Sequence, residues 1–151
     1  MNAIEIRLNA ALVASLMDVI QPVVETLKNE LATPVLLHEE DELLENAWKS
    51  DLLESQRIEI AVTERLFGGD FMNTGCVVVE QEDMDFTLRA CSALRLKLRE
   101  TALGSLDDSQ LEAGSFENVD WDEGLQLGYA AYSLFASMQE IIVSQMDRAC
   151  S

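Results

Sequence analysis

The first residues of the chain alternate between apolar and polar side chains. Ile4, Ile6 and Leu8 are separated by Glu5 and Arg7. A period of two places alternate side chains on one face, as in a half-buried strand. The pattern therefore predicts a short strand at the N-terminus.

Two long stretches of helical periodicity follow this strand. From Ala10 the apolar residues recur every three or four positions, and Pro22 either kinks this first helix or begins another. Thr33-Pro34 ends it. Residues 41–67 form a second helix without Gly or Pro, which Gly68-Gly69 terminates.

A helical wheel places most apolar residues of the second helix on one stripe. Its members are Leu44, Ala47, Trp48, Ile58, Val62 and Leu66. Asp51 and Ser55 fall within the stripe. We expect the stripe to face the core, where the carboxylate of Asp51 would need a cationic partner.

The middle of the chain predicts another strand and a central helix. The β-branched run at residues 76–80 suits a strand, which could pair with residues 4–8 in a ribbon. Residues 81–103 form a third helix that is apolar around most of its circumference. Such a helix belongs in the middle of a bundle, covered by its neighbours.

The last third of the chain predicts an acidic connection and a final helix. Residues 105–123 combine many acids with few apolar positions, which indicates a loop with one helical turn. The final helix covers about residues 121–148. Gly124 and Gly128 give it a small face, suited to close packing inside the bundle or across a dimer.

These elements define one all-α domain over residues 1–151, a bundle of four to five helices with a short two-stranded ribbon. The length is typical of one domain, and 48% apolar residues can form a core. The formal charge of −18 disfavours nucleic acid and anionic membranes as partners. It favours a protein with a basic surface, and a homodimer is compatible with the pattern.

The cysteines indicate a reducing compartment. Cys76, Cys91 and Cys150 are odd in number and lack the close spacing of a disulfide framework or a zinc site. The N-terminus has no signal-peptide pattern, and the apolar stretch at residues 125–143 is interrupted by polar side chains. We therefore expect a cytoplasmic protein.

Four of the ten basic residues lie between positions 89 and 99 of the third helix. Arg89, Arg95 and Arg99 recur at helical spacing and form a polar seam with Asp85 and Ser92. A pair between Asp51 and Arg89 or Arg95 would neutralise both helices. The seam is then a structural ion-pair network. Its alternative role is a ligand site for a small acid or for a partner's C-terminus.

No other constellation compels a chemistry. His38 stands beside the acids at 39–42, but it is the chain's single histidine and makes a poor metal site. Residues 120–131 depart from a calcium loop in the position of the glycine and in having Ala131 last. Cys76 and Cys91 have no histidine nearby in the sequence to activate them. We expect no catalytic residue, no metal and no cofactor.

Three segments carry a resemblance to a known family. Residues 47–53, 94–99 and 134–142, together with the initial strand and the small β-like stretch, resemble an uncharacterised bacterial family, domain of unknown function two-thousand-seventeen. That family has no assigned activity. Its members are often encoded beside the small adaptor that delivers substrates to the Clp protease. The resemblance implies an accessory role in proteolysis, and it transfers no residue roles.

Two functions follow from these observations. The first is a non-enzymatic interaction or regulatory protein that presents an acidic surface, accessory to adaptor-mediated proteolysis. The second is a binder or enzyme for a small anionic ligand, with Arg89, Arg95, Arg99 and Asp51 as the site. The burial and the partners of those four residues distinguish the two.

Overall fold

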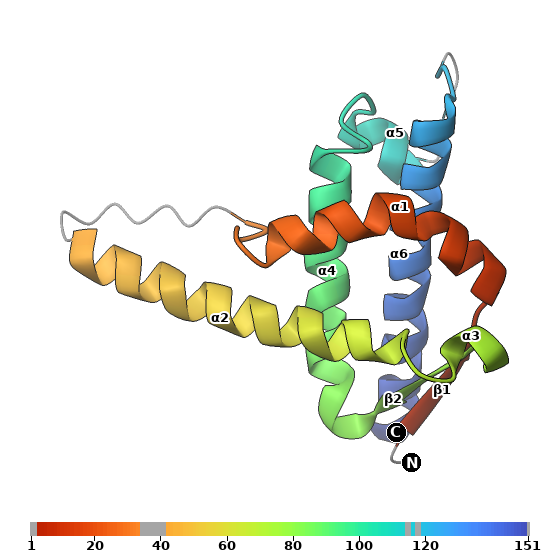
Figure 1. Cartoon of the computed structure of the whole chain (residues 1–151), viewed down its shortest axis with the longest axis horizontal. Coiled ribbons are helices and arrows are strands. Elements are labelled where there is room, and N and C mark those ends of the chain that lie inside the picture. The colour runs from red at the N-terminus through yellow and green to blue at the C-terminus, as the bar shows by residue number, and fades with distance from the viewer. Residues whose placement is uncertain (1–2, 34–41, 114–115, 117–118, 151) are drawn as a thin grey trace.

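The computed structural model describes residues 3–33, 42–113, 116 and 119–150. It contains long helices and one small antiparallel sheet, which confirms the predicted helical bundle with a ribbon (Figure 1). In chain order the elements are β1 (Ala3–Arg7), α1 (Ala10–Leu27), α2 (Glu42–Leu66), α3 (Phe71–Thr74), β2 (Cys76–Glu80), the 3-10 turn η1 (Gln81–Asp83), α4 (Met84–Glu100), α5 (Asp108–Ala113) and α6 (Glu123–Cys150).

The ribbon pairs β1 with β2 in the register expected from the alternating side chains. Ile4 lies opposite Val79 and Ile6 opposite Val77, and all four side chains are buried. Gly75 precedes β2 with a φ of 68°, and a Cβ there would lie 2.7 Å from the carbonyl oxygen of Leu8. The turn into β2 therefore requires glycine, because the Cβ of any other residue would collide with the backbone of Leu8.

The helices form two layers. α4 and α6 lie side by side, and α1 and α2 cross them on one face in opposite directions (Figure 1). The main core lies where the layers meet and contains Leu16 and Leu27 of α1, Ile60 of α2, Leu98 of α4 and Met138 of α6. α4 contacts the other three long helices, which confirms its predicted central place.

Close packing of α6 depends on Gly128. A Cβ at this position would lie 2.7 Å from the Cβ of Ala102, in the turn after α4. Gly124 meets no such obstacle, since its nearest neighbour would be Oδ1 of Asp122 at 3.5 Å. Of the two alternatives left open by the sequence, the small face therefore serves packing within the bundle at Gly128.

Two boundaries differ from the sequence prediction, since α1 ends at Leu27, before Thr33-Pro34, and the third helix begins with η1 before α4. Pro22 lies inside a single α1, one of the two alternatives that the sequence left open. The segment after α4 contains α5, the predicted helical turn, and a small aromatic cluster in which Phe116 packs edge-to-face on Trp121 and Tyr129. This cluster joins the acidic connection to the start of α6.

Within the described residues, α1 is long and apolar enough to cross a membrane by length and composition. Core helices of soluble proteins meet the same criterion. In this fold Val13, Leu16, Ile20, Val23 and Leu27 of α1 are buried, and the helix packs on α4 and α6. Its apolar character is thus used in the core of the bundle.

Candidate functional site

The apolar stripe of α2 faces solvent over most of its length. Leu44 is 55% exposed, Trp48 46% and Ile58 48%, and Ala47, Asp51 and Ser55 between them are also exposed. We call these six residues the α2 stripe. The predicted burial of the stripe is wrong for these positions, and it is right for Val62, which is buried.

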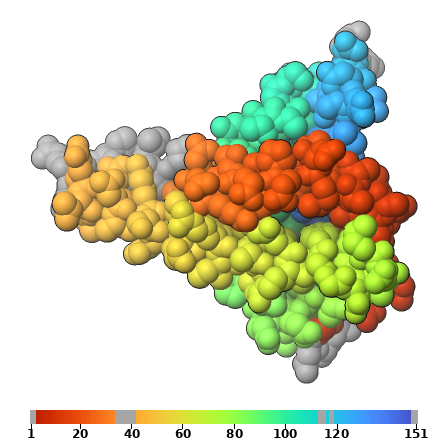
Figure 2. Space-filling view, in the orientation of Figure 1, coloured from red at the N-terminus to blue at the C-terminus, as the bar shows by residue number. Residues whose placement is uncertain are grey.

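Helix length explains why the stripe is uncovered. A helix of 25 residues is about 37 Å long, whereas two adjacent helices are about 20 Å wide. The first part of α2 therefore projects beyond α4, as Figures 1 and 2 show. In this projecting part the side chains of Leu44 and Trp48 are about half exposed.

A different face of α2 points into the bundle. Gln56, Ile60 and Thr63 are buried, and they lie roughly 120° round the helix from the stripe. Gln56 points inward because its side-chain amide forms hydrogen bonds with backbone groups at the end of α1 and in the segment that follows it. Its Nε2 donates to the carbonyl oxygens of Leu27 at 2.5 Å and Glu30 at 2.7 Å, and its Oε1 accepts from the backbone N–H of Ala32 at 3.0 Å.

The proposed partnership of Asp51 with the arginine seam is wrong. Asp51 is exposed, and within the described residues no ion pair joins it to Arg89, Arg95 or Arg99. The physical reason is the orientation of α2, which turns the stripe and its acid away from α4.

Arg89 pairs with a carboxylate that lies about two helical turns after Asp51 on α2. Its Nε lies 3.3 Å from Oε1 of Glu59, and the guanidinium also lies over the ring of Phe86. Both residues line a groove of about 440 Å³ between α2 and α4, together with Leu52, Gln56 and Leu96. Burial raises the pKa of Glu59, and the positive charge of Arg89 opposes this rise only in part.

This pKa shift yields a prediction for Glu59→Gln. A carboxyl group with a raised folded-state pKa binds its proton more tightly when folded, so it removes stability as the pH rises through that pKa. Glu59→Gln lacks the charge, and the wild-type ion pair, in which Arg89 is the exposed partner, contributes at most about 1 kcal/mol. We expect the variant to be at least as stable as wild type at neutral pH.

Urea unfolding at neutral pH and near pH 4 tests this expectation. The advantage of Glu59→Gln should shrink at the acidic pH, where wild-type Glu59 is itself largely protonated. Glu54→Gln, which removes an exposed carboxylate from the same helix, is the control and should show no such trend. A loss of more than about 1 kcal/mol in Glu59→Gln at neutral pH would show that the ion pair dominates.

Arg95 lies on the other side of α4, against α6. Its Nη1 donates to Oε1 of Gln139 at 2.7 Å and its Nη2 to the hydroxyl of Tyr132 at 3.0 Å. The guanidinium carbon lies 4.8 Å from the centre of the Tyr132 ring. Arg95 is thus held by neutral groups, and sequence reasoning missed both because polar residues of α6 carry no recognisable motif.

Arg99 completes the seam one turn later. Its Nη2 pairs with Oδ1 of Asp108, at the start of α5. Arg95 and Arg99 line a pocket of about 250 Å³ with Ser92, Leu96 and Tyr132. The structure therefore divides the predicted seam, with Arg89 in the α2–α4 groove and the other two arginines in what we call the arginine pocket.

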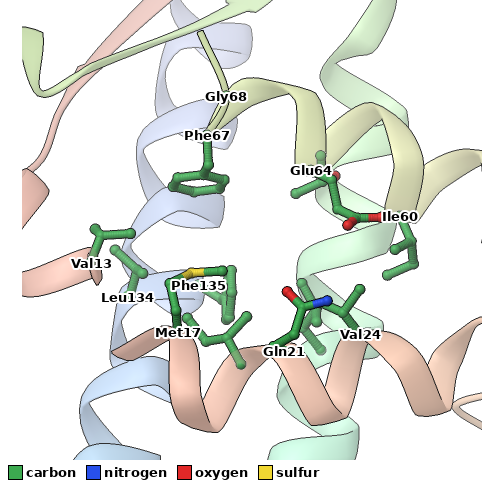
Figure 3. A pocket seen from close by; sticks show the side chains of 13 residues that line it. Val13, Met17, Gln21, Val24, Ile60, Glu64, Phe67, Gly68, Leu134 and Phe135 are labelled. Carbon is green, nitrogen blue, oxygen red and sulfur yellow. The ribbon is translucent and has the colours of Figure 1, made fainter. Parts of the chain in front are cut away.

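A third hollow lies between the two helix layers. Figure 3 shows Phe67, in the turn after α2, above Met17 of α1 and Phe135 of α6. Its volume is about 160 Å³, close to that of an apolar cavity that takes a benzene-sized molecule and below the roughly 300 Å³ at which typical ligand sites begin. It is a packing gap between the layers.

The remaining candidates can be placed individually. His38 lies outside the described residues, and among those described no cluster of three His, Cys, Asp or Glu side chains is arranged to hold a metal. Asp122 acts as a helix cap, since its Oδ1 accepts from the backbone N–H of Leu125 at 2.8 Å. Burial raises the pKa of the Cys91 thiol to about 12, which leaves it unreactive at neutral pH.

Comparisons of the chain with family models, with curated proteins and with solved structures give no match. The resemblance to the uncharacterised bacterial family stays a prediction that rests on the segments quoted above. The α2 stripe, the α2–α4 groove and the arginine pocket are the surface features that bear on function.

Proposed function

We propose that the protein is a non-enzymatic interaction protein that binds a partner through the α2 stripe. The observation that supports this is the exposure of Leu44, Trp48 and Ile58 on a helix that projects from the bundle. Single exposed apolar residues are ordinary, but a stripe at helical spacing with an exposed tryptophan is typical of a binding surface.

The charges around the stripe indicate which class of partner would fit it. Asp51 lies within it and Glu54 beside it, both exposed, in a chain of net charge −18. The stripe fits an amphipathic helix of another protein, with apolar side chains over Trp48 and Lys or Arg opposite the acids. Two copies of this chain would instead bring like charges together, which disfavours self-association.

The groove between α2 and α4 extends this surface toward the bundle. Ser55 belongs to the stripe and also lines the groove, whose far wall includes the half-exposed Leu96 of α4. A bound helix can therefore rest on α2 and insert a side chain beside Leu52 and Leu96. This supplies the concave, apolar centre that stable interfaces need.

The family resemblance suggests a cellular setting for the interaction. Neighbourhood with the adaptor of the Clp protease would make the protein an accessory of adaptor-mediated proteolysis. The purified adaptor is therefore the first defined partner to test, and other basic proteins follow from a crosslinking experiment.

We expect Trp48→Ala to weaken partner binding about ten-fold or more while leaving the fold intact. Truncating a buried tryptophan costs about 3–5 kcal/mol of stability, whereas a surface substitution changes it by less than about 0.5 kcal/mol. The test places a photo-crosslinking residue at position 48, identifies the captured protein, and then measures its affinity for wild type and variants by calorimetry.

Met72→Ala is the matched control, because Met72 is an equally exposed apolar residue on α3, at the far end of α2. It should leave the affinity unchanged. Asp51→Asn should weaken binding and reduce its dependence on salt. Capture of the same proteins from position 72, an affinity insensitive to Trp48→Ala, or self-association that buries Trp48 in sedimentation experiments would each overturn the proposal.

A further inference from the structure

We propose that the arginine pocket binds the carboxylate group of a small organic acid or of a peptide C-terminus. This site goes beyond the proposed function, since it lies between α4 and α6 and includes no residue of the α2 stripe, although Ser92 and Leu96 line both this pocket and the α2–α4 groove.

Arg95 lacks a counter-ion in a chain rich in acids. The protein has 28 acidic and 10 basic residues, and Lys28, Lys49, Arg57, Arg89, Lys97 and Arg99 all have a carboxylate within 4 Å. No carboxylate of a described residue lies within that distance of Arg95. A partly buried cation without an anion is costly, so a carboxylate supplied from outside would be stabilised there.

The side chains around Arg95 hold its guanidinium in one orientation. Gln139 accepts from Nη1, and its own amide donates to the carbonyl oxygen of Leu88 at 2.9 Å and to Oγ of Ser92 at 2.7 Å. Tyr132 provides both a hydroxyl acceptor and a ring face. This support is the kind that a binding arginine needs, because a fixed group loses little entropy when a ligand arrives.

Arg95 also retains donor capacity. A guanidinium has five N–H groups, of which Gln139 and Tyr132 accept two. Nε is buried and has no acceptor among the described residues. Each Nη keeps a second N–H, so a planar carboxylate can form two parallel hydrogen bonds with the guanidinium.

Arg99 shows how the pocket accommodates a carboxylate. Its partner Asp108 is 79% exposed and belongs to a helix of six residues. Exposed ion pairs of this kind contribute at most about 1 kcal/mol, so a ligand can displace Asp108 and engage both arginines. A pocket of about 250 Å³ is smaller than typical drug-sized sites, which suits a short organic acid or a single terminal residue.

The carboxylate class is favoured over phosphate by charge. A dianionic phosphate would meet the repulsion of a chain with net charge −18 more strongly than a monoanionic carboxylate. Ser92, Leu96 and Tyr132, which line the pocket, belong to the middle turns of α4 and α6. The described lining residues include no glycine-rich loop of the kind that binds phosphate.

Nitrogen–proton NMR of the arginine side chains tests the proposal on the native protein. Butyrate and N-acetyl-triglycine are the two monoanionic probes, butyramide and N-acetyl-triglycine amide are their uncharged controls, and inorganic phosphate is the comparison anion. We expect the Arg95 Nε–H signal to shift and saturate with at least one carboxylate and to stay unmoved with both amides. A response to butyrate alone indicates a small organic acid, and a response to N-acetyl-triglycine alone indicates a peptide C-terminus.

Variants show whether the response belongs to this pocket. In the wild-type protein the carboxylate should also shift the backbone amide signals of Leu96 and Tyr132, and Arg95→Gln should abolish these shifts. Arg95→Lys should weaken carboxylate binding about ten-fold, because lysine keeps the charge but lacks the planar guanidinium. Arg65→Gln, an exposed arginine of α2, should bind as wild type does. No saturable shift, equal shifts with the amides, a response to inorganic phosphate alone, or loss of binding in Arg65→Gln would overturn the proposal.

The two proposals fail separately. Loss of carboxylate binding in Arg95→Gln with unchanged partner affinity would leave the α2 stripe as an independent surface. The native-protein titration also remains decisive if Arg95→Gln does not fold, because the uncharged controls require no substitution.

Discussion

Gln56→Glu is expected to lower the free energy of unfolding by about 2–4 kcal/mol at neutral pH. The carboxylate keeps the acceptor for the Ala32 N–H but loses both donors, and its charge faces the carbonyl oxygens of Leu27 and Glu30. Each buried group left without a partner costs about 1–3 kcal/mol. Urea unfolding followed by circular dichroism measures the change.

Gln126→Glu provides the matched control for this experiment. The Gln126 amide donates one hydrogen bond, to the Trp121 carbonyl, in an exposed position near the start of α6. Water can replace that bond, and a negative charge is favourable at a helix N-terminus. A loss in Gln56→Glu no larger than in the control would mean that the Gln56 amide does not hold the end of α1.

The second large effect is expected for Gly128→Val, which should cost about 3 kcal/mol of stability. The new Cβ would stand 2.7 Å from the Cβ of Ala102, and the methyl groups have no free space on that side of α6. Because Ala102 has no flexible side chain, the turn after α4 must move. Thermal unfolding by calorimetry should show a lower melting temperature.

Two further variants separate overpacking from the effect of a β-branched residue in a helix. Gly124→Val makes the same change one turn earlier, where the nearest atom would be 3.5 Å away, and it should cost little. Ala102→Gly should restore part of the stability of Gly128→Val, because it removes the colliding atom. Equal losses at both glycines would exclude the close contact as the cause.

The helices and the ribbon could be predicted because local patterns determine them. The alternation of Ile4 and Ile6, the β-branched run before Glu80 and the Gly68-Gly69 stop are all legible in the sequence. The central place of α4 also follows, since apolar residues on most of a helix require neighbours on most sides.

The orientation of α2 could not be predicted, because a wheel identifies a stripe but not what covers it. The inward direction is occupied by Gln56, whose amide binds backbone groups of a segment more than twenty residues earlier in the chain. That tertiary contact leaves Trp48 and Asp51 in solvent. Both residues belong to the α2 stripe, on which the proposed function depends.

The arginines illustrate the same limit. The spacing of Arg89, Arg95 and Arg99 suggested one seam along the helix, whereas the structure divides them between the α2–α4 groove and the arginine pocket. Their partners come from α2, α5 and α6, and Glu59, Asp108 and Gln139 carry no local signal of these roles. Only the packing of the helices shows which of these arginines forms an ion pair with a carboxylate.

The ribbon has a consequence for how the molecule assembles. β1 and β2 are joined by the whole of α1 and α2, so their pairing closes a long loop before it yields any backbone hydrogen bonds. Contacts of this kind raise the contact order above that of a bundle with short connections, and folding slows as contact order rises. The pairing of the two strands is therefore one of the long-range contacts expected to slow folding, although the strands contribute only ten residues to the structure.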